Sequence, residues 1–261
     1  LVDSNVSDIS DLSDLAVRIA HGGIKPRLLD GSKTYKNWHD AITGEGKWKE
    51  AIQAYLASIY FVDKQLGRVL DALEQSPHGE NTIVVLWSDH GWMLGEKEAW
   101  RKYRPWEDSV RTNFIIKAPG MPPANVKNPV ELLSIWPTLA ELAGLPMKED
   151  LDGRSLVPLM NNPSIHWNFP VITAHVDESG SGGWQSIRTQ KYRYIKYMKT
   201  GDEELYDHTK DPNEWINVID SSTYESVRGK LSELVPDKMT PLGSWNAPND
   251  AVVEHNQSSI Y

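Results

Sequence analysis

Two metal-capable side chains come directly after a short, unbroken apolar segment of the chain. The segment covers residues 82–87, and Asp89 and His90 follow it after a single serine. A run of β-branched and aromatic residues without alternation is typical of a strand buried on both faces of a parallel sheet. In open α/β sheets, ligands collect in the crevice at the carboxyl ends of the strands. The pattern therefore predicts that Asp89 and His90 lie at the rim of such a sheet.

The segments on either side of this strand predict further elements of an α/β fold. A long helix is expected from Lys47 to Glu74, where apolar residues recur every three or four positions and mark one buried face. A second strand is expected at Arg111–Ala118. A third is expected at Val130–Leu133, running into a helix that Gly144 ends. Helices that alternate with strands in this way are typical of an α/β sandwich with a mainly parallel sheet.

The pattern of predicted secondary structure changes from Leu151 onward. Short strands separated by short turns predict a small antiparallel meander, which a helix near Tyr224–Leu234 would cover. The expected strands are Val171–Ala174, Trp184–Thr189, Lys191–Tyr197 and Glu204–Tyr206. We therefore divide the chain into part of a larger α/β domain, residues 1–165, and a small C-terminal α+β subdomain with an extended tail, residues 166–261.

Charge and composition limit the partners of the chain. With 36 acidic and 27 basic residues its net charge is −9, which argues against broad binding to nucleic acid or to anionic membranes. No apolar run is long enough to span a bilayer, and a chain without cysteine has no disulfides and no thiolate metal sites. Positive charge nevertheless gathers just after the Asp-His pair, at Arg101, Lys102, Arg104 and Arg111. Two interpretations stay open for this cluster, an anion-binding pocket and a solvated loop that balances the neighbouring carboxylates.

The residues that follow the Asp-His pair carry a family resemblance. Residues 91–96 read Gly-Trp-Met-Leu-Gly-Glu, and Lys102 stands at the thirteenth position after Asp89. Further segments of the same kind are Leu132–Leu139, Asp152–Leu156, Lys191–Ile195, Glu204–Asp207 and Asp211–Glu214. Together and in this order, these segments resemble the second half of formylglycine-dependent sulfatases, and in particular their iduronate 2-sulfatase-like branch.

The resemblance implies an alkaline-phosphatase-like α/β sandwich and a role for several residues. Asp89 and His90 would be ligands of Ca²⁺ (or Mg²⁺), and Lys102 would be the catalytic residue that binds a sulfate oxygen. Lys97, placed between two glutamates, is expected to face solvent. The residues expected to bind the sugar are Trp100, Arg101 and His175.

The resemblance also implies a part that this chain does not carry. In the family, the nucleophile is a formylglycine made from the cysteine of a Cys-x-Pro-Ser-Arg motif near the N-terminus, and this chain has no cysteine. We therefore expect the formylglycine on a missing N-terminal segment of the same enzyme, and we expect this chain to be inactive alone. Its implied partners are that segment and a sulfated sugar substrate, and the family alone suggests a periplasmic or secreted location.

Two alternatives to a sulfatase remain open. Phosphomonoester, phosphodiester and phosphonate hydrolases of the same superfamily share the fold and part of the metal site, and the nucleophile would separate them from sulfatases. A non-catalytic carbohydrate-binding module built on the sulfatase scaffold would bind sugar without turnover. The residues around Lys102 favour a sulfate ester over the phosphorus esters, whereas the binding module stays open.

Overall fold

The structure, a computed structural model, describes residues 8–28, 31–176 and 183–237. The chain forms two compact units by its internal contacts. The first unit comprises Leu1–Ser10, Val17–Arg104 and Asp108–Ala124, and the second comprises Asp11–Ala16, Pro105–Glu107 and Asn125–Tyr261. The expected boundary between residues 165 and 166 falls inside the second unit and stays a prediction about subdomains. The tail from residue 238 lies outside the described residues.

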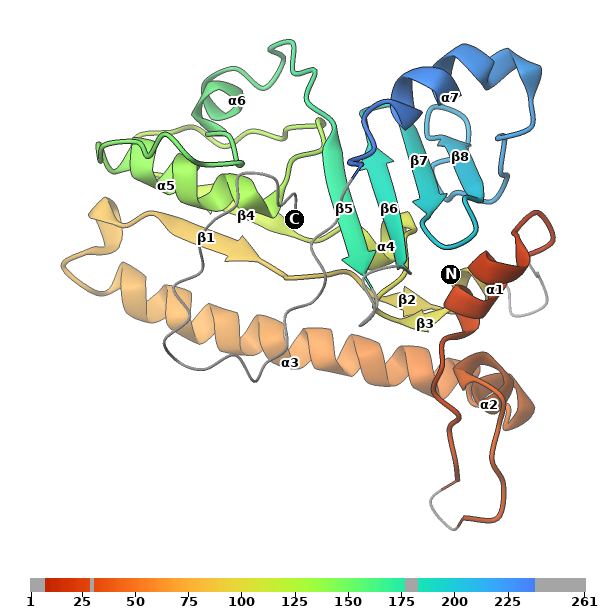
Figure 1. Ribbon diagram of the computed structural model, residues 1–261. Helices are drawn as coiled ribbons and strands as arrows, with labels where there is room; N and C mark the ends of the chain where they lie inside the picture. The colour runs from red at the N-terminus through yellow and green to blue at the C-terminus, as the bar shows by residue number, and fades with distance from the viewer. Residues whose placement is uncertain (1–7, 29–30, 177–182, 238–261) are drawn as a thin grey trace, which may run out of the picture. The chain divides into compact units, whose positions relative to one another are not determined.

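The first unit combines helices with two small pairs of strands (Figure 1). Its longest element is α3 (Trp48–Glu74), which confirms the helix predicted from the apolar period. The strands predicted on either side of the Asp-His pair are also present, as β1 (Val84–Trp87) and β4 (Phe114–Lys117). The remaining elements are α1 (Asp14–His21), α2 (Trp38–Gly44), η1 (Gly79–Asn81), β2 (Met93–Leu94), η2 (Glu96–Glu98), β3 (Trp100–Arg101) and α4 (Glu107–Val110). The first residues of α1, up to Ala16, and Glu107 of α4 belong to the second unit.

Strands β1 and β4 pair antiparallel, with Val84 opposite Lys117 and Trp87 opposite Phe114. The parallel pairing expected from the apolar run is therefore wrong for these two strands. The reason lies in the connection between them, which holds the β2–β3 hairpin, η2 and the four-residue α4. Parallel neighbours are usually joined by a helical crossover. The connection, residues 88–113, is long enough for one but holds no helix longer than the four residues of α4, and it returns the chain in the opposite direction.

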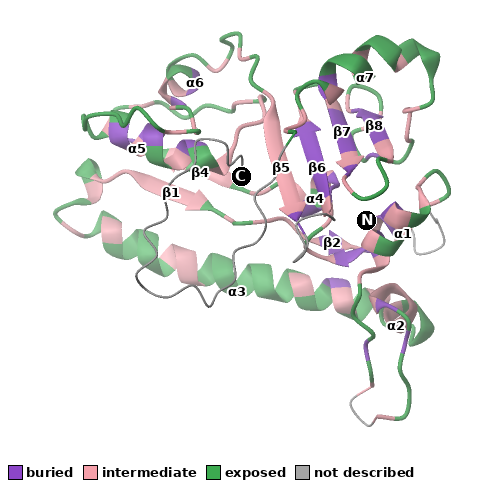
Figure 2. Cartoon of the chain, viewed as in Figure 1, coloured by how far each residue is buried: buried purple, intermediate pink, exposed green. Residues whose placement is uncertain are grey.

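The expected burial of α3 and β1 is not found within the described residues. Only Ile52 of α3 is buried, whereas Ile59, Val62 and Val69 on its apolar stripe are at least half exposed (Figure 2). Trp87 of β1 is 49% exposed. A two-stranded sheet consists only of edges, so neither strand is enclosed by neighbours. The apolar period identifies the face of a helix that can pack against another element. It does not show that the chain contains an element to cover that face.

No helix among the described residues combines the length and the apolar character that a membrane span requires. The longest, α3, has 27 residues, but Asp63, Lys64, Arg68 and Asp71 stand in its C-terminal half.

The second unit begins with helical turns where a strand was expected. Residues Leu132–Ser134 form the 3-10 helix η3, which leads into α5 (Ile135–Leu142). The strand predicted at Val130–Leu133 is therefore wrong, because a short apolar run cannot be told from the first turn of a buried helix by its pattern alone. The predicted stop is confirmed, since Gly144 takes a positive φ of 65° just past the end of α5.

The predicted antiparallel meander and its covering helix are both present in the second unit (Figure 1). Its strands lie in the order β5-β6-β7-β8, and Ile187, Tyr194, Leu205 and Leu231 form a buried cluster between the sheet and α7. Figure 2 shows this burial on β6, β7 and β8. The elements are α6 (Val157–Asn161), β5 (Val171–Val176), β6 (Gly183–Arg188), β7 (Tyr192–Tyr197), β8 (Glu203–Asp207), η4 (Ser222–Tyr224) and α7 (Glu225–Ser232).

Candidate active site

The end of β1 presents a carboxylate and an imidazole side by side. The Asp89 side chain is 71% exposed, and its Oδ2 lies 3.5 Å from Nε2 of His90. Nδ1 of His90 lies 2.8 Å from the carbonyl oxygen of Gly91. Because a carbonyl oxygen only accepts hydrogen bonds, Nδ1 carries the proton in neutral His90, and the lone pair of Nε2 stays available.

These two donors fit a divalent cation. Their separation of 3.5 Å suits neighbouring positions around an ion with ligand distances of about 2.3–2.6 Å. The hydrogen bond from Nδ1 to a backbone carbonyl is also the arrangement that fixes the tautomer and the ring orientation of metal-ligating histidines. Asp89 and His90 would therefore hold the ion jointly, with most of its coordination shell left to other groups.

The backbone after His90 is fastened to the loop around α4. The N–H groups of Gly91 and Trp92 donate to the carbonyls of Ser109 and Asp108, at 2.8 and 2.7 Å. A Cβ at Gly91 would overlap the carbonyl oxygen of Asp108, so only glycine permits this close approach. The position of the donor pair is thus set by the chain on both sides of it.

Stacked rings hold the imidazole from one side. The ring of Trp92 stacks on that of His90 at a centroid distance of 6.2 Å and on that of Tyr55, in α3, at 6.3 Å. This series connects the N-terminal half of the long helix to the candidate metal ligand. The tryptophan of the Gly-Trp segment therefore supports the site, although no metal-binding or catalytic atom lies on it.

The hairpin β2–β3 carries two of the predicted site residues, Trp100 and Arg101. Met93 pairs with Arg101 and Leu94 with Trp100. The Trp100 ring is buried and lies edge-on to Trp48 at 5.1 Å, which indicates a packing role for most of its surface. The guanidinium of Arg101 lies 5.9 Å from the ring of Trp38. Their proposed contacts with a sugar stay predictions.

Backbone strain is concentrated in and just after this hairpin. Four residues without the freedom of glycine take positive φ values there: Lys97 (49°), Glu98 (53°), Arg101 (76°) and Tyr103 (69°). Each such residue costs on the order of 1–3 kcal/mol, and such conformations cluster at functional sites. Strain of this density supports a functional role for residues 97–103.

The two lysines of this segment are placed differently. Lys97, expected in solvent, is only 1% exposed, and its Nζ lies 3.5 Å from the carbonyl oxygen of Asp8. That expectation is wrong because the flanking glutamates have other partners: Glu96 accepts the N–H of Leu94, and Glu98 contacts His21 at 2.8 Å. A lysine with a positive φ at this turn is thereby directed inward.

Lys102 stays at the surface of the first unit and is half-buried, with its Nζ 5.0 Å from the ring centroid of Tyr103. Arg104 fastens the segment that carries it, donating to the carbonyls of Lys102 (3.2 Å), Tyr103 (3.1 Å) and Ala20 (3.1 Å). Burial and the nearby charge of Arg101 lower the pKa of Arg104 to about 10, so this clamp remains charged at neutral pH. The catalytic assignment of Lys102 stays a prediction.

His175, the remaining predicted sugar contact, belongs to the second unit. It lies on β5 opposite Trp184 of β6, with ring centroids 6.0 Å apart. Trp184 is buried. The substrate-binding assignment of His175 also stays a prediction.

A buried charge cluster in the second unit was not predicted. Atoms of Glu107, His208 and Glu214 lie within 4.8 Å of one another, close enough to surround an ion. Two guanidiniums already neutralise the carboxylates, however: Arg193 contacts both glutamates, and Arg188 donates to Glu107 at 3.1 Å. His208 contacts Glu214 at 2.8 Å. We therefore interpret the cluster as a structural ion-pair network. Arg193 and Glu214 lie in two of the segments that carry the family resemblance, but the members of the cluster are far apart in sequence, and no local pattern showed that they would meet.

Comparison with known proteins gives consistent matches along the chain. Residues 20–145 match the family model described as sulfatase, and residues 95–240 match the model described as N-sulphoglucosamine sulphohydrolase, C-terminal. A sulfatase from Formosa agariphila is 42% identical over 207 residues, which are 78% of this chain and 39% of that protein. A delta 4,5-hexuronate-2-O-sulfatase from Bacteroides thetaiotaomicron is 29% identical over 217 residues, 77% of this chain and 45% of that protein. The chain thus spans less than half the length of either relative.

Solved structures that superpose on this chain agree with the family matches. A 2-O GAG sulfatase superposes with a TM-score of 0.69 at 25% identity, covering 84% of this chain and 47% of that one. A protein in complex with its substrate D-glucosamine-2-N,6-O-disulfate superposes with a TM-score of 0.63 at 27% identity, covering 72% and 40%. A phosphonate monoester hydrolase of Agrobacterium radiobacter superposes with a TM-score of 0.57 at 27% identity, covering 66% and 38%.

Proposed function

The chain belongs to the sulfatase family, with its alkaline-phosphatase-like α/β fold, and on this premise we propose that it forms part of an enzyme that hydrolyses sulfate esters of a sulfated carbohydrate. The observation that carries the proposal is the donor pair Asp89 and His90 at the end of β1, with the Nε2 of His90 left free to bind a cation. Relatives named for hexuronate and glycosaminoglycan sulfates support a carbohydrate substrate.

The chemistry of sulfate ester hydrolysis explains why these residue types would serve it. Negative charge grows on the sulfuryl oxygens and on the departing alkoxide as the S–O bond breaks. A divalent cation, when bound by Asp89 and His90, supplies Lewis-acid stabilisation of that charge. Lys102 would place an ammonium group against a sulfate oxygen before the reaction begins, so that no reorganisation is needed in the transition state. Arg104 would act as a positioning residue, because it holds the carbonyl of Lys102.

We propose that the nucleophile, a formylglycine, is supplied by another segment of the same enzyme. The family reaction requires a modified cysteine, and this chain contains none. The exposed apolar stripe of α3 supports a covering segment, because contiguous apolar surface of this kind marks an interaction site. Asp89 and His90 would then be two ligands of a metal site that the other segment completes.

The similarity to a phosphonate monoester hydrolase supports a second candidate, hydrolysis of phosphonate or phosphate esters. A third, a carbohydrate-binding module without turnover, shares the sugar chemistry but not the reaction. In the resemblance the position of Lys102 contacts sulfate, which favours the sulfatase over hydrolysis of phosphorus esters, and turnover separates it from the binding module.

Complementation tests the proposal directly. The chain would be co-expressed with the N-terminal segment of the Formosa agariphila relative together with a formylglycine-generating enzyme, and inorganic sulfate release from sulfated oligosaccharides would be measured. We expect release that requires both polypeptides and Ca²⁺ or Mg²⁺. Faster cleavage of phosphonate esters than of sulfate esters would support the second candidate, and sugar binding without product from any ester would support the third.

A further inference from the structure

The second unit contains a cleft of about 820 Å³, within the range of about 300–1,000 Å³ that is usual for ligand sites. It lies at the end of β5 and β6 where Val171 pairs with Arg188, whereas His175 stands near the opposite end of β5. The segments that line it are residues 125–129, 163–170, 189–192 and 227–231. None of these residues belongs to the proposed sulfate-ester chemistry.

The lining of this cleft is positively charged in a protein that is strongly acidic overall. Lys127, Lys191, Lys230 and His166 line it, and no aspartate or glutamate does so among the residues that the structure describes. Within the described part of the chain, none of the three lysines forms an ion pair. Three unneutralised ammonium groups around one concave surface, in a chain of net charge −9, select for an anionic ligand.

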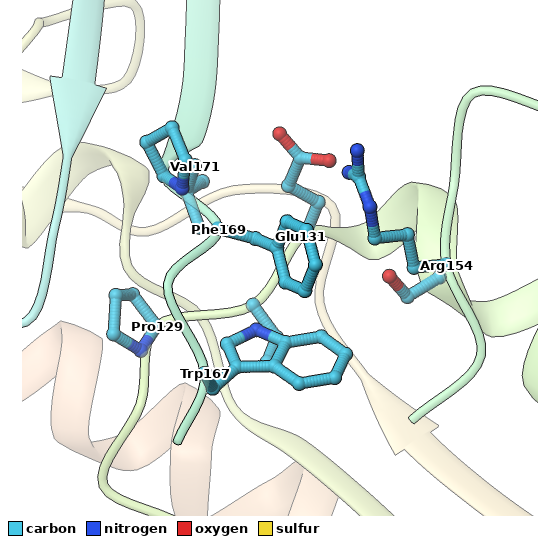
Figure 3. Close-up of a pocket in the computed structure, with 9 residues that line it drawn as sticks. Pro129, Glu131, Arg154, Trp167, Phe169 and Val171 are labelled. Atoms are coloured by element: carbon cyan, nitrogen blue, oxygen red, sulfur yellow. The ribbon is translucent and has the colours of Figure 1, made fainter. Parts of the chain in front are cut away.

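Two aromatic rings form one wall of the cleft. Trp167 and Phe169 lie edge-on at a centroid distance of 4.9 Å, and Phe169 is 43% exposed. Arg154 holds its guanidinium 4.3 Å from the Phe169 ring. Figure 3 shows the two rings beside Arg154 and Glu131, around a small neighbouring hollow of about 10 Å³.

That hollow has room for about one water molecule, so it does not itself bind a sugar. Its carboxylate is already engaged, because Glu131 accepts the N–H of Ile172 at 3.0 Å. The hollow and the cleft share Trp167 and Phe169, so Arg154 supports the aromatic wall of the cleft.

We propose that this cleft binds a segment of an anionic polysaccharide, stacking sugar rings on Trp167 and Phe169 and pairing sulfate or carboxylate groups with Lys127, Lys191 and Lys230. Aromatic faces suit the apolar faces of sugar rings, and lysines suit charges whose spacing along a polymer varies, because the ammonium is a mobile point charge. The proposal deepens the proposed function, on which it rests for the class of polymer. The cleft would hold the polysaccharide that carries the sulfate ester.

The test is a binding measurement on the full chain, without turnover, using calorimetry with three polymers. Dextran sulfate, polygalacturonate and neutral dextran separate a sulfated from a carboxylated ligand and both from an uncharged one. We expect an anionic polymer to bind and neutral dextran not to bind. Replacing the three cleft lysines together by glutamine should weaken binding by at least about tenfold, since three charge contacts are lost.

A matched control removes the same charge elsewhere. Lys36→Gln, Lys49→Gln and Lys199→Gln, combined in one variant, change exposed lysines outside the cleft and should weaken binding by less than about twofold. Trp167→Ala leaves the charge unchanged and should weaken binding by about five- to tenfold if the ring stacks on sugar. Because the lysines are exposed, their replacement tests the proposal even if Trp167→Ala does not fold.

Three results would overturn the proposal. These are equal losses in the cleft and control lysine variants, equal binding of neutral dextran, and tighter binding of single-stranded DNA than of either anionic polysaccharide with the same dependence on the cleft lysines. Sulfate release in the complementation assay is a separate readout. Failure of the cleft proposal would therefore leave the sulfatase proposal standing, and the two failures are told apart by which readout is lost.

Discussion

At the end of β1, a backbone carbonyl decides which nitrogen of His90 is available to a cation. The contact of Nδ1 with the carbonyl of Gly91 leaves Nε2 as the free donor, 3.5 Å from the Asp89 carboxylate. Two donors fall short of the six to eight that Ca²⁺ usually takes. The isolated chain should therefore bind Ca²⁺ weakly in calorimetry, and Asp89→Ala should abolish the signal. Addition of the complementary segment should tighten binding, and equal affinity with and without it would contradict a shared site.

Substitutions of Lys102 and Lys97 are expected to have different effects, the first on activity and the second on stability. Lys102 is half-buried at the surface, and loss of one preorganised charge contact typically costs on the order of 10²–10³ in rate. In the complemented enzyme, Lys102→Ala should lose about that much sulfate release while its thermal unfolding stays unchanged. Lys97 is buried, so Lys97→Ala should instead lower the unfolding midpoint. Lys49→Ala, at an exposed position, is the control. Near-normal turnover for Lys102→Ala would defeat its assignment.

The charge cluster of the second unit predicts loss of stability in acid. Burial raises the pKa of Glu107, but the attraction of Arg193 and Arg188 outweighs it and lowers the pKa to about 2 from an ordinary value of 4.5. Burial likewise opposes ionisation of Glu214, and Arg193 again prevails and lowers its pKa. A carboxylate with a depressed pKa stabilises the fold above pH 4.5, and this contribution is lost as the pH falls toward 2.

Urea unfolding at pH 6, 4 and 3 checks this prediction. The free energy of unfolding should fall by a few kcal/mol over that range, given ~1.4 kcal/mol per unit of pKa shift for a fully coupled group. Glu107→Gln should unfold more easily at pH 6 and show a flatter pH dependence. A pH dependence that is the same in the variant and the parent would contradict a stabilising role for this carboxylate.

The predictability of single residues depended on whether their partners were close in sequence. Asp89, His90 and Lys102 stood out because they fall within one short motif-bearing stretch. Lys97 was misplaced because Glu96 and Glu98 are typical of a solvated face, whereas its contact with Asp8 spans 89 positions. Likewise the N–H of Glu107 donates to Glu214 across 107 positions. A contact between residues so far apart in the chain cannot be predicted from a local sequence pattern.

At the scale of elements, periodic segments were predicted well and their partners were not. The bounds of α3 were predicted to within one residue, because its apolar period extends over 27 positions. The β5–β8 meander was predicted because strand-like segments follow one another in the sequence with short stretches between them. The β2–β3 hairpin was missed, since strands of two residues are shorter than any period. The direction of β4 was missed because an apolar run gives no information about the orientation of its neighbour.

The exposed stripe of α3 gives a prediction at this same scale. Ile59→Gln, Val62→Gln and Val69→Gln, combined, change side chains that are at least half exposed. Such surface changes usually alter stability by no more than about 0.5 kcal/mol each. The isolated variant should therefore stay folded and bind less of a hydrophobic dye, while its co-purification with the complementary segment should fall several-fold. Gln53→Ala and Lys64→Ala, on polar positions of α3, are the controls, and equal co-purification of all variants would contradict a covering role.

At the scale of the whole molecule, burial is distributed unevenly between the units. The second unit has an enclosed core between its four-stranded sheet and α7, and the charge cluster reinforces it. Within the described residues of the first unit, α3 has one buried side chain and β1 has none. We therefore expect the chain not to unfold in one cooperative transition, because regions with few buried apolar contacts open locally at a low free energy.

Hydrogen exchange measures this difference along the chain. Amides of β6 and β7 should exchange slowest, because their side chains are mostly buried and both strands lie inside the sheet with a neighbour on each side. The C-terminal half of α3 should exchange much faster, because its exposed helix opens without disturbing a core. If the proposed complementary segment covers the stripe, its addition should slow exchange in α3 and β1 and leave β6–β8 unchanged. Uniform protection in the isolated chain would show instead that the two units unfold together.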